Sequence, residues 1–324
     1  MDLTARNAYN RCKNIVAYAR ESTIVALLRL IIGSDKTLRV LSKSVIASDR
    51  ALDALSEAII TSDRALKDAA ERIDKEGLRR WLDRIEQPAT DDMVNVGANV
   101  REAWIEAKAK TLPDGSKVLD AGAGQCPYRK YFAHCDYRTH DFARYEGTAS
   151  GVLKERWDYG ELDYVCDITA IPEPDGFFEA VICTEVLEHV PDPINTLREL
   201  CRLVGPGGRL FLTAPLGSGL HQEPYHFYGG FTPHFYRKFL SDFGCDIVEL
   251  KPINGLMKTV GQEVYRVGRV LHGTSHDFAS IVAVFVLMNW LPRYLARMEK
   301  EMLIEEFPVG YLVEARKIRA GSPG

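Results

Sequence analysis

From Lys117 to Lys317 the sequence alternates between short apolar runs and stretches whose apolar residues have helical spacing. Strands that alternate with helices form largely parallel, doubly wound sheets, whose ligands bind at the carboxyl ends of the strands. The sequence therefore predicts an α/β domain with a mostly parallel, seven-stranded sheet. The seven predicted strands are KVLDAGAG, YRTHDF, DYVCDI, EAVICTEV, GRLFLTAP, CDIVELKP and VGYLVEARK.

A glycine-rich turn follows the first predicted strand, where Asp120, Gly122 and Gly124 lie within DAGAGQCP. Glycine allows a sharp turn and a close approach of the backbone to a ligand. The dinucleotide-binding fingerprint needs a third glycine three residues after the second, and Pro127 stands there. Nicotinamide or flavin binding is therefore disfavoured. The carboxylate of Asp120, directly before the glycines, suits a ligand with a cationic group better than a pyrophosphate.

The N-terminal third has a heptad pattern. Every seventh residue from Ile24 is apolar, and three residues further on large residues alternate with serine. A fourteen-residue unit, SDKTLRVLSKSVIA, thus recurs as SDRALDALSEAIIT and SDRALKDAAERIDK, and neither proline nor glycine interrupts residues 34–76. This pattern is typical of a helix that buries a narrow stripe against another helix. The heptad residues are Ile24, Ile31, Leu38, Val45, Leu52, Ile59, Leu66 and Ile73.

We therefore expect two parts in the chain. Residues 1–90 are predicted to be a helical, coiled-coil segment that assembles two or more chains, and residues 91–324 to be the α/β domain. The alternative for the first part is a hairpin or bundle that packs against its own chain.

The composition is that of an ordinary globular protein, with 46% apolar residues, 27% charged residues and a net charge of −4. The mild acidity argues against a nucleic-acid partner. The seven cysteines form no CxxC pair, which favours a reducing compartment. The longest nearly apolar run, at 278–291, is too short to span a bilayer. We expect a cytoplasmic protein, with peripheral membrane contact left open.

The order of several motifs resembles the class I methyltransferases that use S-adenosylmethionine. The motifs are VLDAGAG, the acid Asp141 in THDF, CDI at 166–168, FFEAVICTEVLEHVPDP and LVGPGGRLFLTAP. More narrowly, they resemble the branch that includes ubiquinone-biosynthesis and bacterial sugar or glycan methyltransferases. The resemblance runs from about Lys117 to Leu250 and resumes at 309–317. It implies a Rossmann-like methyltransferase fold, an enzyme, and S-adenosylmethionine as cofactor.

The resemblance also implies roles for individual residues. Asp120, Gly122 and Gly124 would face the methionine part of the cofactor, and Asp141 would accept its ribose hydroxyls. Asp167 and the backbone of Ile168 would bind the adenine, and Glu185 would lie near the reactive methyl group. The alternative for Asp141 is a carboxylate that only caps local structure. Cys126 departs from the family pattern, in which a third glycine is common.

A hydroxyl acceptor would benefit from a base, although the sulfonium methyl is already activated for an in-line displacement. The candidates lie after the fifth predicted strand, in HQEPYHFY, where His221 and His226 share a loop with Tyr225. Histidine titrates near neutral pH and suits the task. We expect His221, His226 and Glu185 to form the catalytic group. In the alternative, His221 and His226 only form hydrogen bonds that hold an ordered loop. We expect His234 to begin the next helix and to have no chemical role.

Glu185, Glu188 and His189 form an ExxEH pattern that spans about one helical turn, and His226 would be the fourth ligand of a hard divalent cation. Such a cation prefers a shell rich in oxygen, which the pattern does not provide. We therefore predict no metal and keep a divalent cation as the alternative.

An insertion at 253–308, with two helical stretches, separates the last two predicted strands. It suits an acceptor lid, a chain-to-chain surface or shallow membrane contact. We expect O-methylation of a sugar or surface-glycan hydroxyl. The alternatives are a quinone, lipid or other small hydroxylated acceptor, and a scaffold that keeps the fold without the chemistry.

Overall fold

The computed structural model describes residues 96–148, 155–274, 283–284 and 286–318. Residues 1–90, for which the sequence predicts a coiled coil, lie outside the described residues, so this segment and its boundary stay predictions. Residues 87–275 and 283–324 form one compact unit, to which all the described residues belong.

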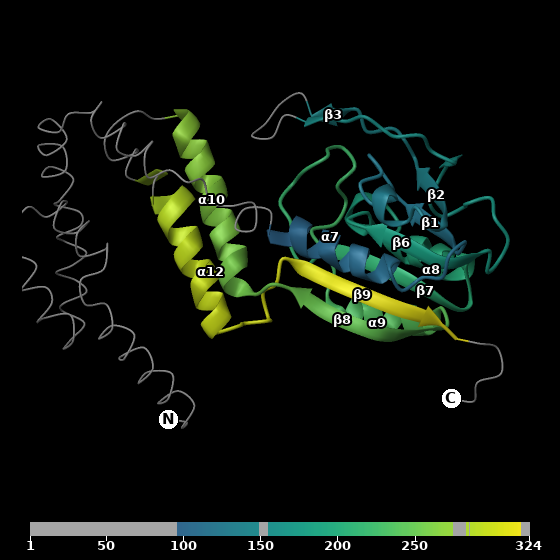
Figure 1. Cartoon of the computed structure of the whole chain (residues 1–324). Coiled ribbons are helices and arrows are strands. Elements are labelled where there is room, and N and C mark those ends of the chain that lie inside the picture. The colour runs from purple at the N-terminus through teal and green to yellow at the C-terminus, as the bar shows by residue number, and fades with distance from the viewer. Residues whose placement is uncertain (1–95, 149–154, 275–282, 285, 319–324) are drawn as a thin grey trace, which may run out of the picture. The chain divides into compact units, whose positions relative to one another are not determined.

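A seven-stranded sheet is the centre of this unit, and each predicted apolar run contributes one strand to it (Figure 1). The strand order is β5-β2-β1-β6-β7-β9-β8. The first five strands in this order pair in parallel, whereas β9 is antiparallel to both β7 and β8. The prediction of a mostly parallel sheet is confirmed. The bounds are β1 (Lys117–Ala121), β2 (Asp136–Asp141), β5 (Tyr164–Val165), β6 (Phe178–Thr184), β7 (Val204–Pro215), β8 (Cys245–Ile253) and β9 (Gly310–Lys317).

Helices cover both faces of the sheet. Alternation along β1 sends Leu119 to one core, shared with α8 (Pro193–Leu203) and α9 (Pro233–Asp242). It sends Val118 to a second core, shared with α7 (Val96–Ala109) and the flank of η1 (Arg129–Tyr131). Proline stands at the start of both α8 and α9, a position where its missing N–H costs nothing. The two cores hold the carboxyl ends of β1, β2 and β6 in fixed positions.

Two short strands, β3 (Gly147–Thr148) and β4 (Glu155–Arg156), form a separate antiparallel pair in the connection between β2 and β5. The sequence pattern gave no sign of this pair, because each strand has only two residues. A 3₁₀ turn, η2 (Leu187–His189), follows β6.

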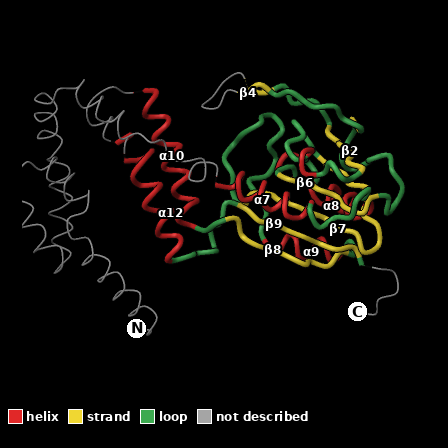
Figure 2. The backbone as a smooth tube through the Cα atoms, in the orientation of Figure 1, coloured by secondary structure: helices red, strands yellow, loops and turns green. Residues whose placement is uncertain are grey.

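The predicted insertion lies between β8 and β9, and two helical stretches are present in it. α10 (Leu256–Thr274) packs against α12 (Leu291–Glu301), and a π-helical turn, η3 (Val286–Trp290), leads into α12 (Figure 2). The buried Glu299 of α12 accepts the backbone N–H groups of Gly255 and Lys258 at 3.0 and 2.8 Å. It thereby caps the first turn of α10, where N–H groups have no partner within the helix. None of the described helices is long and apolar enough to cross a membrane.

An ionic cluster ties α7 to the antiparallel edge of the sheet. Lys108 donates to Glu249 of β8 and, at 2.7 Å, to Glu314 of β9, and Arg209 of β7 donates to Glu314 at 2.9 Å. The Lys108, Glu249 and Glu314 side chains are 16%, 14% and 5% exposed, so this cluster is largely withdrawn from water.

We expect Lys108→Ala to lower the free energy of unfolding by about 2 to 3 kcal/mol, because it leaves two largely buried carboxylates without their shared cation. Denaturant unfolding followed by circular dichroism measures this loss. Lys110→Ala is the matched control, since Lys110 forms an exposed pair with Glu106 and should cost less than about 0.5 kcal/mol. Equal losses in the two variants would contradict the assigned role of the cluster.

The same cluster predicts how stability changes with pH. Burial alone would raise the pKa of Glu249, but hydrogen bonds from Lys108 and Lys251 lower it to about 2, from an ordinary value of 4.5. A carboxyl whose pKa is lower in the folded state contributes stability above its unfolded pKa. We therefore expect this contribution to be lost as the pH falls from about 4.5 to about 2. Unfolding midpoints measured across this range should fall less steeply in Lys108→Ala than in the wild type.

Candidate functional site

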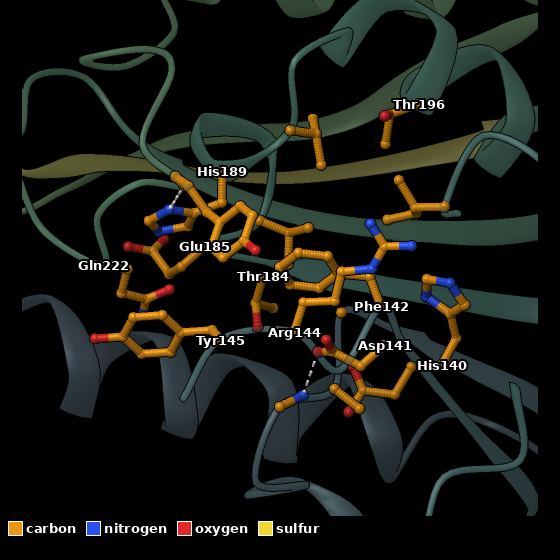
Figure 3. Close-up of a pocket in the computed structure, with 18 of the residues that line it drawn as sticks. His140, Asp141, Phe142, Arg144, Tyr145, Thr184, Glu185, His189, Thr196 and Gln222 are labelled. Carbon is orange, nitrogen blue, oxygen red and sulfur yellow. Dashed lines mark hydrogen bonds between the residues drawn. The ribbon is translucent and has the colours of Figure 1, made fainter. Parts of the chain in front are cut away.

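A cavity of about 830 Å³ opens at the carboxyl ends of β1, β2 and β6, where the fold predicts a ligand site. Its volume is within the range of sites for small molecules and cofactors. In Figure 3, His140 and Asp141 lie on one side of it, and His189, Glu185, Gln222 and Tyr145 lie on the other. The cavity thus has two halves with different chemistry.

The glycine turn after β1 forms part of the cavity wall, as predicted. Gly122 and Gly124 have φ angles of +78° and +53°, which residues with a Cβ rarely adopt. A Cβ on Gly122 would lie 2.4 Å from Cγ2 of Val186, so a side chain has no room there. Cys126, the departure from the family pattern, adopts a φ of +55° and donates its N–H to the carbonyl of Ala123 at 2.8 Å. The turn is therefore as tight as a third glycine would allow.

Asp141 ends β2 directly beside this turn. Its Oδ2 accepts the N–H of Gly124 at 2.9 Å, and its Oδ1 accepts the N–H of Ala143 at 3.0 Å. Asp141 is buried and lines the cavity. The carboxylate therefore braces the turn, which is the local role weighed as the alternative, and it also has lone pairs left for a ligand.

Asp167 and Ile168 line the same half of the cavity, after β5. Oδ1 of Asp167 accepts the N–H of Thr169 at 2.9 Å and its hydroxyl at 2.7 Å. These bonds lower the pKa of Asp167, so the carboxylate is charged near neutral pH. Neither of these two hydrogen bonds involves Oδ2 of Asp167. The sequence placed both residues near the ligand, and the structure brings them to the cavity.

Asp120 is almost fully buried where β1 meets the cavity. Burial raises the pKa of Asp120 to about 7, although a hydrogen bond from the Tyr137 hydroxyl opposes the rise. A group with this pKa gains a full negative charge when a cation binds beside it. Asp120 is therefore suited to a ligand with a cationic group, as the sequence predicted.

Glu185 lies in the second half of the cavity with a φ of +54°, at the end of β6. Its Oε1 accepts the hydroxyl of Thr213 at 2.8 Å, and its Oε2 lies 3.3 Å from the Arg101 guanidinium. Arg101 comes from α7, lines the cavity and also donates to the Tyr128 hydroxyl at 3.2 Å. No sequence motif marks Arg101, because α7 precedes every recognisable motif. Its helical position, three residues before the buried Trp104, was the only available signal.

Three histidines cluster beside Glu185, but only one of them lines the cavity. The His221 ring centroid lies 4.7 Å from that of His189 and 4.5 Å from that of His226. His189 lines the cavity, whereas the two predicted bases, His221 and His226, are not among its lining residues. Nδ1 of His189 is 2.6 Å from the Tyr225 carbonyl, so Nδ1 carries the proton and Nε2 has a free lone pair.

Burial keeps His189 neutral. It lowers the pKa of His189 to about 4, although the hydrogen bond to the Tyr225 carbonyl raises it; His221 and His226 lower it as well. Nε2 of His189 is 3.8 Å from Oε1 of Glu188, which is 1% exposed. Burial and the charge of Glu185 raise the pKa of Glu188 well above its ordinary value. A neutral imidazole thus lines the cavity, with a buried carboxyl near its Nε2.

Part of this cluster has the geometry of a cation site. Glu188, His189 and His221 offer ligand atoms that all lie within 4.8 Å of one another. This set differs from the one considered from the sequence, because it includes His221 in place of Glu185 and His226. A set of two imidazoles and one carboxylate suits zinc better than magnesium, because magnesium prefers a shell made of oxygen ligands. The expectation that the protein has no metal stays a prediction.

The fold and the cavity together define a class of protein. A seven-stranded sheet with its last strand in sequence antiparallel, a glycine turn after the first strand and an acid after the second are the features of class I methyltransferases that use S-adenosylmethionine. Residues 96–250 match the family described as a methyltransferase domain. This chain therefore contains a methyltransferase domain of that class.

Individual relatives point to one branch of the class. A ubiquinone biosynthesis O-methyltransferase of Pseudomonas aeruginosa (strain UCBPP-PA14) is 33% identical over 150 residues, which are 45% of this chain and 62% of that protein. The protein of the same name from Xanthomonas oryzae pv. oryzae (strain PXO99A) is 37% identical over 108 residues, which are 31% of this chain and 43% of that protein. The chain thus spans less than two thirds of the length of these curated relatives.

Among solved structures, the phosphoethanolamine N-methyltransferase 2 of Haemonchus contortus, in complex with S-adenosyl-L-methionine, aligns with a TM-score of 0.41 and 16% identity. The alignment covers 68% of this chain and 52% of that one.

Proposed function

We propose that this protein is an S-adenosylmethionine-dependent O-methyltransferase whose acceptor is a small hydroxylated aromatic molecule. The observation that carries the proposal is the division of one cavity into an acidic half beside the glycine turn and a second half with aromatic residues and a neutral histidine. When bound, S-adenosylmethionine supplies an activated methyl group. The residues of this chain would bind the cofactor, orient the acceptor and deprotonate its hydroxyl group.

The acidic half has the right groups for the cofactor. Asp141 would accept the ribose hydroxyls, and Asp167 with the backbone of Ile168 would hold the adenine. Asp120 would face the positively charged amino-acid end, and Gly122 would let the turn pack closely against Val186 beside it. Arg101 is a partly buried cation of the cavity wall and suits the carboxylate of the same end. The guanidinium would then exchange part of its contact with Glu185 for the ligand.

The second half favours an aromatic acceptor. Phe142 and Tyr225 pack edge to face with ring centroids 4.9 Å apart, and Tyr145 and Phe227 also line the cavity. Such rings offer flat apolar surface to a planar ligand. The relatives reported above are named ubiquinone biosynthesis O-methyltransferases, and that name supports a hydroxylated ring rather than the sugar we expected from the sequence. A glycan therefore becomes the competing acceptor in the test.

His189 is our candidate for the base. Its Nε2 would take the proton of the acceptor hydroxyl while the oxygen attacks the methyl carbon and the carbon–sulfur bond breaks. The charge of the sulfonium is lost in the same step, so the products are the methyl ether, S-adenosylhomocysteine and a proton held on His189. His221 and His226 would support His189 without contacting the acceptor. Glu185 would position Arg101 beside the cofactor.

Isothermal titration of the full-length protein with S-adenosylmethionine and S-adenosylhomocysteine tests the cofactor. We expect micromolar dissociation constants for both. Absence of binding to either would overturn the enzymatic proposal and favour a scaffold that keeps the fold without the chemistry.

A further inference from the structure

Residues 157–161, which we name the strap, lie across the glycine turn. Three contacts join the two segments. Cζ2 of Trp157 would be 2.9 Å from a Cβ on Gly124, Sγ of Cys126 would be 3.1 Å from a Cβ on Gly160, and Arg129 donates to the carbonyl of Glu161 at 2.9 Å. The indole of Trp157 therefore sits directly on the turn that would hold the cofactor.

The indole N–H of Trp157 is buried and has no hydrogen-bond partner among the described residues. Indole nitrogen can only donate, so an unsatisfied N–H in this position costs free energy. Such groups are rare in folded proteins and call for an explanation. Trp157 also lines the cavity.

Neighbouring rings fix the orientation of the indole. Tyr145 packs against it edge to face with centroids 5.3 Å apart, and Tyr159 does so from another side at 6.2 Å. The Tyr159 hydroxyl in turn accepts the backbone N–H of Tyr145 at 3.0 Å. The donor is thus held in place before any ligand arrives, which lowers the entropic cost of using it.

Gly124 places Trp157 next to Asp141. The N–H of Gly124 donates to Asp141, and the open side of the same glycine is in contact with the indole. The side chain that carries the unpaired donor and the carboxylate acceptor therefore both line the cavity and both contact Gly124. A hydroxyl group satisfies both at once, because it donates its hydrogen to a carboxylate while its oxygen accepts from an N–H.

We propose that Trp157 is a cofactor-binding residue whose indole N–H donates to a ribose hydroxyl oxygen, while that hydroxyl donates to Asp141. The inference rests on the proposed function and adds a donor from outside the methyltransferase motifs. Titration of Trp157→Phe, which removes the N–H and keeps an aromatic ring, tests it. Trp290→Phe is the matched control. Trp290 directly precedes α12, stacks on Tyr294 within that helix and does not line the cavity.

Two ligands distinguish a contact to the nucleoside from one to the amino-acid end. S-adenosylhomocysteine has ribose, adenine and an amino-acid end, and 5′-methylthioadenosine has only the first two. Loss of one neutral hydrogen bond weakens binding about 3- to 10-fold. We expect Trp157→Phe to weaken both ligands by this same factor and Trp290→Phe to weaken neither. A loss confined to S-adenosylhomocysteine would overturn the ribose assignment, because the donor would then face the amino-acid end.

Tryptophan fluorescence gives a readout that a merely structural role would not move. The chain has four tryptophans, and we expect the emission change on ligand binding to come mainly from Trp157. The change should persist in Trp290→Phe and largely disappear in Trp157→Phe at saturating ligand. Wild-type affinity in Trp157→Phe would refute the inference while leaving the proposed function intact. Failure of the wild type to bind either ligand would instead refute the proposed function.

Discussion

Replacing Asp141 with alanine is expected to weaken the binding of S-adenosylhomocysteine on the order of 100-fold. A hydrogen bond to a charged group contributes about 1.5 to 3 kcal/mol, and the carboxylate is proposed to accept one or two from the ribose. The variant also frees the N–H of Gly124, which loosens the glycine turn. Titration calorimetry with the wild type and the variant side by side measures the difference.

Two further variants separate ligand contact from local bracing. Asp141→Asn keeps an acceptor for Gly124 but removes the charge, so it should fold normally and bind with intermediate affinity. Asp136→Ala lies at the other end of β2, where Asp136 pairs with Arg138 near solvent, and should bind as the wild type does. An Asp141→Ala variant that folds and retains wild-type affinity would mean that Asp141 only caps the turn.

Replacing His189 with alanine or asparagine is expected to lower kcat at least about 100-fold, with little change in affinity for S-adenosylhomocysteine. General base catalysis typically contributes 10²- to 10⁴-fold. Asparagine is the more informative change, because its amide can still donate to the Tyr225 carbonyl while it cannot act as a base. The exposed His234 on α9 provides the control, and His234→Ala should leave kcat unchanged.

The pH dependence of the rate checks the same assignment. The base must be unprotonated, so the rate should fall as the pH drops through the pKa of His189, which is about 4. An acid limb near 6.5, the ordinary value for histidine, would contradict His189 as the base. A large loss in His221→Ala with none in His189→Asn would favour the residue predicted from the sequence.

A chelator distinguishes a base from a metal ligand. Activity that survives dialysis against EDTA supports the proton-transfer role of His189. Activity that is lost and then restored by zinc would show that Glu188, His189 and His221 hold an ion, contrary to the expectation of no metal.

The sheet was predictable from sequence because its strands are buried on both faces. Leu119 and Val118 on β1 point to opposite cores, yet both are apolar, which gives the continuous apolar runs of a covered parallel strand. β3 and β4 were not predictable, because two-residue strands carry no periodicity. The motifs predicted that Asp120, Gly124 and Asp141 lie together, since these residues are fixed to the ends of adjacent strands, and all three line the cavity.

The rest of the cavity depends on contacts between segments that are distant in sequence. Arg101 reaches Glu185 only because α7 packs across the sheet, and no motif marks that helix. His189 and His221 belong to different loops, and the fold decides which of them faces the ligand. The position of His189 was not predictable from sequence, because η2 places it in the wall of the cavity, whereas the spacing of ExxEH suggested a metal ligand on a helix.

The most direct test of the proposed function is transfer of an isotopically labelled methyl group from S-adenosylmethionine to catechol by the full-length protein, with a simple glycoside as the competing acceptor. We predict monomethylated catechol and an equal amount of S-adenosylhomocysteine, and far less of both products with Asp141→Ala when the cofactor concentration is close to the wild-type dissociation constant. Methylation of the glycoside alone would contradict the aromatic acceptor. A protein that binds the cofactor but methylates no hydroxyl of either kind would contradict the proposed O-methyltransferase.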